Sequence, residues 1–158
     1  MNAGDHVETP CGVKIYRPEH YESLVKMYDA FRPKGVFQGM PPRNRATRIQ
    51  WIDNLVANGE NALAWLEDSV IGHVAIIPDF TKVDAEYLIF VNQENRGRGV
   101  GKKLTSKIIE RARQLALARI WLTVDAYNFR GIRLYKRFGF QFSQEHCSAS
   151  ERTMILTL

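Results

Sequence analysis

A glycine-rich turn, Arg96-Gly-Arg-Gly-Val-Gly-Lys102, carries the residues of this 158-residue chain that are best suited to chemistry. Successive glycines let a backbone adopt positive φ and approach a ligand closely. The unpaired N–H groups at the start of the helix that we expect after the turn, with the positive end of its dipole, favour a phosphate. Arg96, Arg98 and Lys102 add positive charge. The turn therefore predicts an anion site.

Two common phosphate motifs do not fit this turn. A Walker A loop reads GxxxxGK[ST], but position 96 is Arg and position 103 is Lys. A dinucleotide fingerprint reads GxGxxG, but Lys102 and Leu104 stand where its last glycine would be required. Taken alone, this motif is also compatible with a plain glycine turn that binds no ligand.

The net positive charge of the chain is concentrated in one stretch. Seven basic residues and one acidic residue lie between Arg96 and Arg113, whereas the whole chain carries a net charge of +5. The remainder is therefore slightly acidic. A nucleic-acid binder more often spreads basic residues over a broad face, so a local anion site is the better interpretation.

The elements around the turn follow from the spacing of apolar residues. Lys82–Val91 alternates with period two and predicts a strand before the turn. Val100–Leu117 has a helical stripe that predicts a helix after it. Arg119–Val124 is apolar enough for a buried strand. Asn128–Phe138 predicts a helix that begins at an asparagine cap and ends at Gly139.

The other segments complete an α/β chain of the α+β kind, a mixed sheet with helices on both faces. The length suits one domain, which we expect at residues 13–158 after a flexible tail at residues 1–12. Asp68-Ser69 predicts a hairpin turn. The remaining predicted helices are Glu19–Phe31 and about Arg43–Ala57, and the remaining predicted strands are Val13–Tyr16, Ala62–Glu67, Val70–Ile77, Phe140–Phe142 and Thr153–Leu158.

Two motifs together resemble the GNAT superfamily of N-acetyltransferases. Arg96–Gly101 matches the acetyl-CoA loop (R/Q)xxGx(G/A), and Tyr87–Val91 looks like the splayed central strand that precedes it. Asn128–Phe140 is similar to the pattern N-x-x-A-x-x-(L/F)-Y-x-x-x-G-F, with Gly131 where alanine is usual. The motifs occur in the family's order and at about its separation, and the flanking elements match through nearly the whole chain.

The resemblance implies a GNAT-like mixed sheet of about seven strands, splayed at the acyl-CoA site. Backbone N–H groups of Phe90, Val91 and their neighbours would hold the pantetheine arm and the thioester carbonyl, and Asn128 would hydrogen-bond the pantetheine. The amides of Arg96–Lys102 would hold the pyrophosphate. The residues that the resemblance assigns to acetyl-CoA are Phe90, Val91, Arg96, Gly97, Arg98, Gly99, Val100, Gly101, Lys102, Asn128 and Tyr135.

Two residues are candidates for proton transfer. The resemblance makes Tyr135 the general acid, because a phenol of pKa near 10 can protonate a thiolate of pKa about 8.5 when the two are in contact. The alternative is a core tyrosine. Glu86 is the candidate base, since alternation places it on one strand face with Leu88 and Phe90. Ordered water as the base, or a merely solvated Glu86, stays open. Asp84 shares that face and is a weaker candidate.

Other residues carry weaker signals. His73 lies on a predicted central strand, where a structural role competes with contact to substrate. In the family, the first two helices and their loop bound the acceptor pocket. Basic residues there would favour an acceptor with a carboxylate or phosphate, unless they form a solvated face. An exposed Phe37 and Met40 would alternatively form a dimer or protein-binding patch. These basic residues are Arg32, Lys34, Arg43, Arg45 and Arg48.

Composition excludes several classes. Hydrophobic residues make up 45% and charged residues 25%, as in soluble globular proteins. Cys11 and Cys147 lack CxxC spacing, so we expect no metal, redox or disulfide site. No apolar run is long enough to cross a bilayer, and Met1–Glu8 does not resemble a signal peptide, so we expect a cytoplasmic protein without a membrane or nucleic-acid partner. Family members are often dimers, and a homodimer stays open.

The resemblance thus implies an acyltransferase that moves the acetyl group of acetyl-CoA directly to a primary amine in a ternary complex. The amine belongs either to a small molecule or to a protein lysine or N-terminus. The alternative is a non-catalytic acyl-CoA-binding sensor or regulatory protein on the same fold.

Overall fold

The computed structural model describes residues 11–34, 40–145 and 148–158. Most of the predicted tail, residues 1–10, lies outside them, and so does Phe37. The strands are β1 (Gly12–Ile15), β2 (Glu60–Leu66), β3 (Ser69–Asp79), β4 (Asp84–Val91), β5 (Arg119–Asp125), β6 (Gln141–Phe142) and β7 (Glu151–Thr157). The helices are α1 (Tyr21–Ala30), α2 (Arg45–Asn58), α3 (Val100–Gln114) and α4 (Phe129–Arg137), with short 3-10 helices η1 (Pro18–His20) and η2 (Gln93–Asn95).

The strands form one seven-stranded sheet in the order β1-β2-β3-β4-β5-β7-β6. All neighbours are antiparallel except β4 and β5, which are parallel. The predicted mixed sheet of about seven strands is therefore confirmed.

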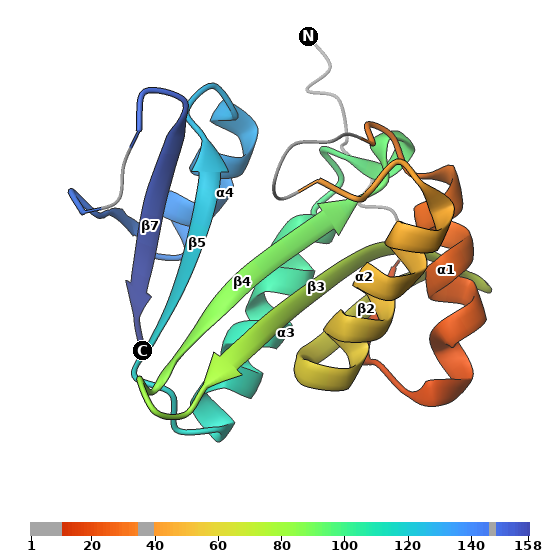
Figure 1. Cartoon of the computed structure of the whole chain (residues 1–158), viewed down its shortest axis with the longest axis horizontal. Helices are drawn as coiled ribbons and strands as arrows, with labels where there is room; N and C mark the ends of the chain where they lie inside the picture. The colour runs from red at the N-terminus through yellow and green to blue at the C-terminus, as the bar shows by residue number, and fades with distance from the viewer. Residues whose placement is uncertain (1–10, 35–39, 146–147) are drawn as a thin grey trace, which may run out of the picture.

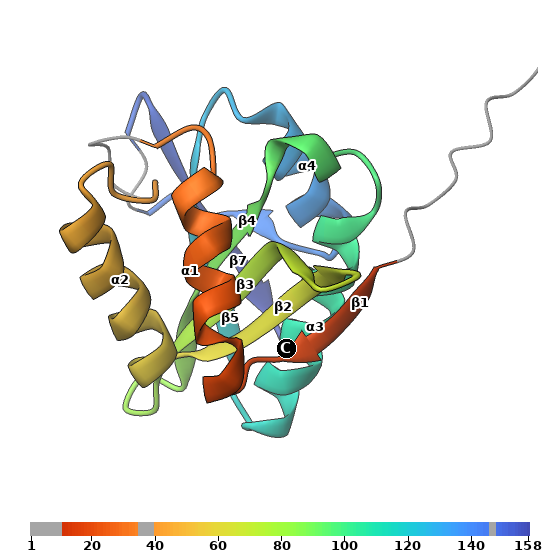
Figure 2. The same cartoon turned by 90° about the vertical axis from the view of Figure 1, so that its right-hand side faces the viewer.

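Helices cover both faces of the sheet, as predicted (Figures 1 and 2). On one face, Leu24 and Tyr28 of α1 and Ile52 of α2 pack in one apolar cluster with Leu63 of β2. On the other face, α3 buries the predicted stripe up to Ala112 against β2, β3 and β4, and α4 joins the same cluster through its tyrosine. The sheet is thus packed against helices on both faces, and the two faces present different helices.

Differences from the predicted boundaries lie where the backbone turns. β4 begins at Asp84 because Val83 has φ 57°, a left-handed conformation that ends extended structure. α3 ends at Gln114 because Ala116 has φ 57°. The predicted hairpin is present, but its turn is Glu67-Asp68, with Leu66 opposite Ser69.

Candidate active site

A cleft opens where β4 and β5 part. The two strands pair only at their beginnings, through Asp84↔Arg119, Ala85↔Ile120 and Glu86↔Trp121. Beyond these pairs they diverge toward the top of Figure 1. The space between them has a volume of about 2360 Å³ and is lined by β4, the glycine-rich turn, α4, β5, α2 and the end of α1. The splay predicted for this strand is present.

The open edge of β4 presents backbone donors to the cleft. Asn92 N–H donates to the Ile71 carbonyl of β3 at 3.0 Å, and Phe90 stands opposite His73 two positions earlier. Because N–H directions alternate along an antiparallel strand, Phe90 N–H also faces β3. The N–H groups of Ile89 and Val91 face the gap instead. Of the expected pair, the geometry therefore favours Val91 as the donor, and Phe90 contributes its side chain to the wall.

The glycine-rich turn has the backbone that a phosphate cradle needs. Gly97 and Gly99 have φ values of 75° and 79°, which favour glycine. Gly99 is the residue before α3, so the first N–H groups of that helix have no intrahelical partner. Every residue from Arg96 to Lys102 lines the cleft. The predicted anion site and the splayed strand therefore share one cavity.

Two sources of positive charge surround this turn. Arg98 and Lys102 lie on it, and α4 adds Arg130, Arg133 and Arg137, all of which line the cleft. The Arg96 side chain has a different role. Its Nε donates to the Val91 carbonyl at 3.0 Å, its Nη2 donates to the Arg32 carbonyl at 3.3 Å, and its guanidinium lies 5.7 Å from the centre of the Phe31 ring. The Arg96 side chain thus ties the end of β4 to the end of α1.

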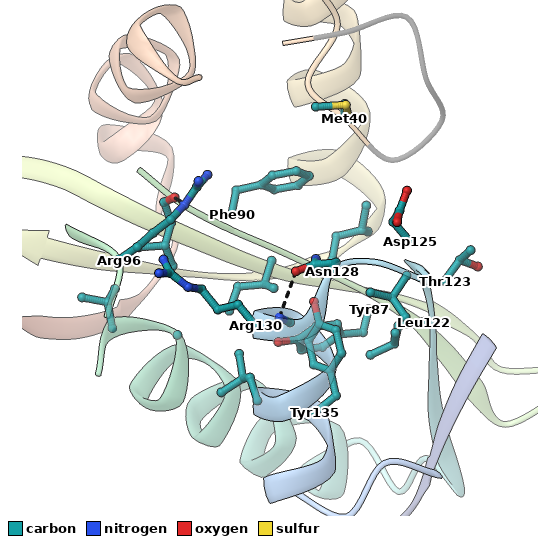
Figure 3. A pocket seen from close by; sticks show the side chains of 18 of the residues that line it. Met40, Tyr87, Phe90, Arg96, Leu122, Thr123, Asp125, Asn128, Arg130 and Tyr135 are labelled. Atoms are coloured by element: carbon teal, nitrogen blue, oxygen red, sulfur yellow. Dashed lines mark hydrogen bonds between the residues drawn. The ribbon is translucent and has the colours of Figure 1, made fainter. Parts of the chain in front are cut away.

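Asn128 begins α4 and also lines the cleft. Its Oδ1 accepts from Gly131 N–H at 3.0 Å, which confirms the predicted asparagine cap (Figure 3). A Cβ added at Gly131 would lie 2.7 Å from Nδ2 of Asn128. The departure from the family's usual alanine therefore has a physical correlate: glycine leaves room for Asn128 to fold over the helix start.

Tyr135 points from α4 into the cleft (Figure 3). Its side chain is buried, and burial raises the pKa of its hydroxyl to about 12. Tyr87 packs edge-on against it with ring centres 5.7 Å apart. Tyr87 shares a 2.8 Å hydrogen bond with Thr105 Oγ1, whereas the described residues give the Tyr135 hydroxyl no partner. Tyr135 is therefore available to a ligand as a protonated donor.

Glu86 is the last residue of β4 that pairs with β5, so it lies where the cleft begins. Its side chain is half-buried, and burial raises the pKa of its carboxyl group. It has no ion pair or hydrogen bond within the described part of the chain. Asp84 differs, because it is buried beside Arg119 with 3.6 Å between Oδ2 and Nε. Glu86 is the better placed of the two candidate bases.

His73 belongs to a buried hydrogen-bond chain outside the cleft. Asn61 Nδ2 donates to the Leu55 carbonyl at 2.9 Å, so Asn61 Oδ1 accepts from His73 Nε2 at 2.7 Å. His73 Nδ1 then accepts from the Tyr28 hydroxyl at 2.6 Å. Burial lowers the pKa of His73 to about 3. Of the two roles left open for His73, the structural one applies.

Of the five basic residues from the end of α1 into α2, three contact Asp29. Arg48 is buried, donates to Asp29 at 2.6 Å and also donates to the carbonyls of Pro42 and Arg43. Arg45 pairs with Asp29 at 3.5 Å, and Lys34 donates to the Asp29 carbonyl. None of the five basic side chains proposed for an anionic acceptor lines the cleft. That expectation has no support in the geometry.

Several cleft residues carried no sequence signal of their own. Trp51 of α2 and Asn54 one turn later line the cleft beside Phe90, while Thr123 and Asp125 line it from β5. The apolar stripe of α2 is formed by Ile49, Ile52 and Val56, and Trp51 lies off it. An aromatic residue outside that stripe was the one sequence signal for a ligand-facing position. Among the described residues, no group of three His, Cys, Asp or Glu side chains could hold a metal. The described helices are also too short or too polar to span a membrane.

Comparisons with known proteins agree with this geometry. The chain is 37% identical over 70 residues to the spermine/spermidine N(1)-acetyltransferase of Bacillus subtilis, covering 44% of this chain and 46% of that protein. It is 26% identical over 98 residues to an L-amino acid N-acyltransferase of Escherichia coli, covering 59% of this chain and 57% of the relative. The chain thus spans about half the length of the curated relatives that it matches.

Solved structures share the fold at low sequence identity. A GNAT-family acetyltransferase from Streptococcus pneumoniae has a TM-score of 0.75 at 17% identity and covers 94% of this chain and 99% of its own. An acetyltransferase from Salmonella typhimurium, solved with acetyl-CoA, has a TM-score of 0.71 at 17% identity and covers 94% of both chains. The family model for the acetyltransferase (GNAT) family matches residues 21–140, which include the cleft's β4, glycine-rich turn and α4. The chain belongs to the acetyltransferase (GNAT) family.

Proposed function

We propose that this protein is an acetyl-CoA-dependent N-acetyltransferase that transfers the acetyl group directly to a primary amine in a ternary complex. One observation supports this above all others. A free strand edge, a glycine cradle with positive φ and a buried protonated phenol open into the same cleft. These features fit the acyl arm, the pyrophosphate and the leaving thiolate of an acyl-CoA.

Binding would use backbone groups first. The amides of the turn and of the α3 start would hold the pyrophosphate, and the basic side chains of α4 would add charge attraction. The amide-bearing pantetheine arm would pair with the open edge of β4 through Ile89 and Val91, as an added strand does. The acetyl carbonyl would then lie near the splay, where a fixed N–H stabilises the developing oxyanion.

Two side chains would move protons. Glu86 would accept the proton of the attacking amine, directly or through one water molecule, because its raised pKa makes it a better base than an exposed glutamate. The C–N bond forms, the C–S bond breaks, and the Tyr135 hydroxyl would protonate the departing thiolate. Burial raises the pKa of Tyr135 to about 12, and the same burial disfavours the thiolate, so burial raises the pKa values of the donor and of the leaving group alike.

The names of the relatives support an amine acceptor: one acts on spermine and spermidine, the other on L-amino acids. The acetyl-CoA bound in the Salmonella neighbour supports the donor. We also propose a cytoplasmic location. A homodimer and a single domain at residues 13–158 stay predictions.

The test combines calorimetry with turnover. Micromolar binding of acetyl-CoA and CoA, without binding of ATP, is expected. Tyr135→Phe should lower kcat by about 100-fold or more while acetyl-CoA affinity stays within a factor of two or three. Tyr127→Phe is the matched control, because Tyr127 is 76% exposed and does not line the cleft.

The enzyme and the non-catalytic sensor predict different results. Acetyl-CoA binding without acetylation of any amine would favour the non-catalytic sensor. No binding of acetyl-CoA would reject the cofactor assignment and the function with it.

A further inference from the structure

The cleft has two walls of different charge. We call the side formed by α1, α2 and the α1-facing residues of β4 the acceptor wall; its main residues are Phe31, Met40, Trp51, Leu88, Phe90 and Glu86. Among the described residues that form this wall, Glu86 is the one with a charged side chain. The opposite wall carries the cations of the glycine-rich turn and of α4. A ligand that crosses the splay therefore passes from a cationic site to an apolar one.

The acceptor wall is an aromatic surface with a fixed shape. Trp51 meets Phe90 edge-on at 5.5 Å between ring centres, and Phe31 meets Phe90 at 5.7 Å. Tyr28 supports both Trp51 and Phe90 from beneath, at 5.0 and 5.7 Å. Trp51 and Phe90 are only partly buried, so each leaves ring surface open to the cleft. Such surface binds an apolar or aromatic group well.

Among the described residues, no lysine or arginine belongs to the acceptor wall itself, and Arg96 lies at its edge with its guanidinium 5.7 Å from the centre of the Phe31 ring. The Nε and Nη2 groups of Arg96 donate to the carbonyls of Val91 and Arg32, which hold this guanidinium against the end of β4. Arg45 and Arg48 pair with Asp29, Lys34 donates to the Asp29 carbonyl, and none of the five basic residues of this segment lines the cleft. A carboxylate beside the reacting amine would therefore lie among apolar side chains and near the Glu86 carboxylate, which is costly.

A polycation fits this wall no better. One carboxylate, Glu86, can receive one ammonium group, and the surrounding side chains are apolar. The other acids of the cleft, Asp125 and Glu151, line it from β5 and β7, across the gap from β4. Asp125 Oδ1 there already accepts from Tyr127 N–H at 2.8 Å.

We propose that the acceptor is a primary monoamine on an apolar body without a carboxylate, with an arylalkylamine as the simplest example. The inference rests on the proposed function and specifies its substrate class. The ring would pack against Trp51 and Phe90, and the amine would reach Glu86 at the start of the splay.

The experiment measures kcat/KM by release of CoA thiol from acetyl-CoA with matched amines. The probes are 2-phenylethylamine, L-phenylalaninamide, L-phenylalanine and spermidine. We expect 2-phenylethylamine to exceed L-phenylalanine and spermidine by at least 100-fold. L-Phenylalaninamide carries a neutral amide in place of the carboxylate of L-phenylalanine. Its kcat/KM should therefore recover most of the difference between L-phenylalanine and 2-phenylethylamine.

Two variants test the wall itself. Asn54→Lys places a cation on the part of α2 that lines the cleft and should lower the preference for 2-phenylethylamine over L-phenylalanine at least fivefold. Asn58→Lys makes the same change one turn further along α2, outside the cleft, and should leave the preference unchanged. Trp51→Leu should raise KM for 2-phenylethylamine at least tenfold without changing acetyl-CoA affinity by calorimetry.

The outcomes separate the two claims. If acetyl-CoA binds and L-phenylalanine or spermidine is the better acceptor, the proposed function stands and the substrate class is wrong. If acetyl-CoA binds but 2-phenylethylamine is not acetylated, the class is again overturned. If Asn54→Lys and Asn58→Lys shift the preference equally, the wall does not select against carboxylates. If acetyl-CoA does not bind, the function itself fails.

Discussion

The buried His73 makes the stability of the protein depend on pH in a way that can be worked out. Its pKa is about 3 in the folded chain against an ordinary value of 6.5, because burial disfavours the charged ring. The folded-state pKa is lowered, so the unfolded chain binds the extra proton between pH 6.5 and 3. The stabilising effect is therefore complete above pH 6.5 and is lost as the pH falls. At 1.36 kcal/mol per pKa unit, going from pH 7 to pH 5 costs about 2 kcal/mol.

Urea unfolding followed by tryptophan fluorescence at pH 7, 6 and 5 measures this loss. His73→Gln is the reference variant, since a Gln amide can accept from the Tyr28 hydroxyl and donate to Asn61 but does not titrate. The free energy of unfolding of the wild type should fall by about 2 kcal/mol more than that of the variant between pH 7 and 5. Equal losses in the two proteins would refute the assignment of a buried neutral His73.

Three further predictions concern the cleft. Gly99→Ala should lower the free energy of unfolding by about 1–2 kcal/mol in urea melts, because φ at Gly99 is 79°; Gly12→Ala, where a Cβ meets nothing within 4 Å, should change it by less than about 0.5 kcal/mol. Glu86→Gln should remove the acidic limb of the pH profile of kcat/KM, a limb that lies above pH 4.5 in the wild type because burial raises the pKa of Glu86; an unchanged limb would assign the base to another group. Arg133→Gln with Arg137→Gln should weaken acetyl-CoA binding about tenfold at low salt and less at high salt, whereas Lys103→Gln, outside the cleft, should have little effect.

Local sequence was sufficient for the backbone of this site. Positive φ at Gly97 and Gly99 follows from the glycines, and the cap at Asn128 follows from an asparagine before a helical stripe. The alternation along β4 is enough to place Glu86 and Phe90 on one face. These features depend on residues within a few positions of one another, so a single segment determines each of them.

Charge was harder to place from the sequence. Arg48 stands in a basic segment that suggested either a solvated face or an anion site, yet it is buried against Asp29, 19 positions earlier. Trp51 lies off the apolar stripe of α2, so helical spacing gave it no role. It lines the cleft because α2 lies beside the splay, a relation between distant segments. Local patterns do not report such relations.

The two proposed functions of β4 depend on the same alternation of N–H groups and side chains along the strand. Ile89 and Val91 have N–H groups that face the gap, and their side chains point toward α3. Glu86 and Phe90 have N–H groups that face β3, and their side chains point toward the acceptor wall. A shift by one residue would exchange both properties at once, turning Glu86 away from the acceptor and closing the donors against β3. This alternation is fixed by the antiparallel pairing with β3, which extends from Asp79↔Asp84 to Gly72↔Val91. The strand edge proposed for the cofactor and the wall proposed for the acceptor are therefore not independent: a change that shifts the register of β4 against β3 should affect acetyl-CoA binding and amine selection together.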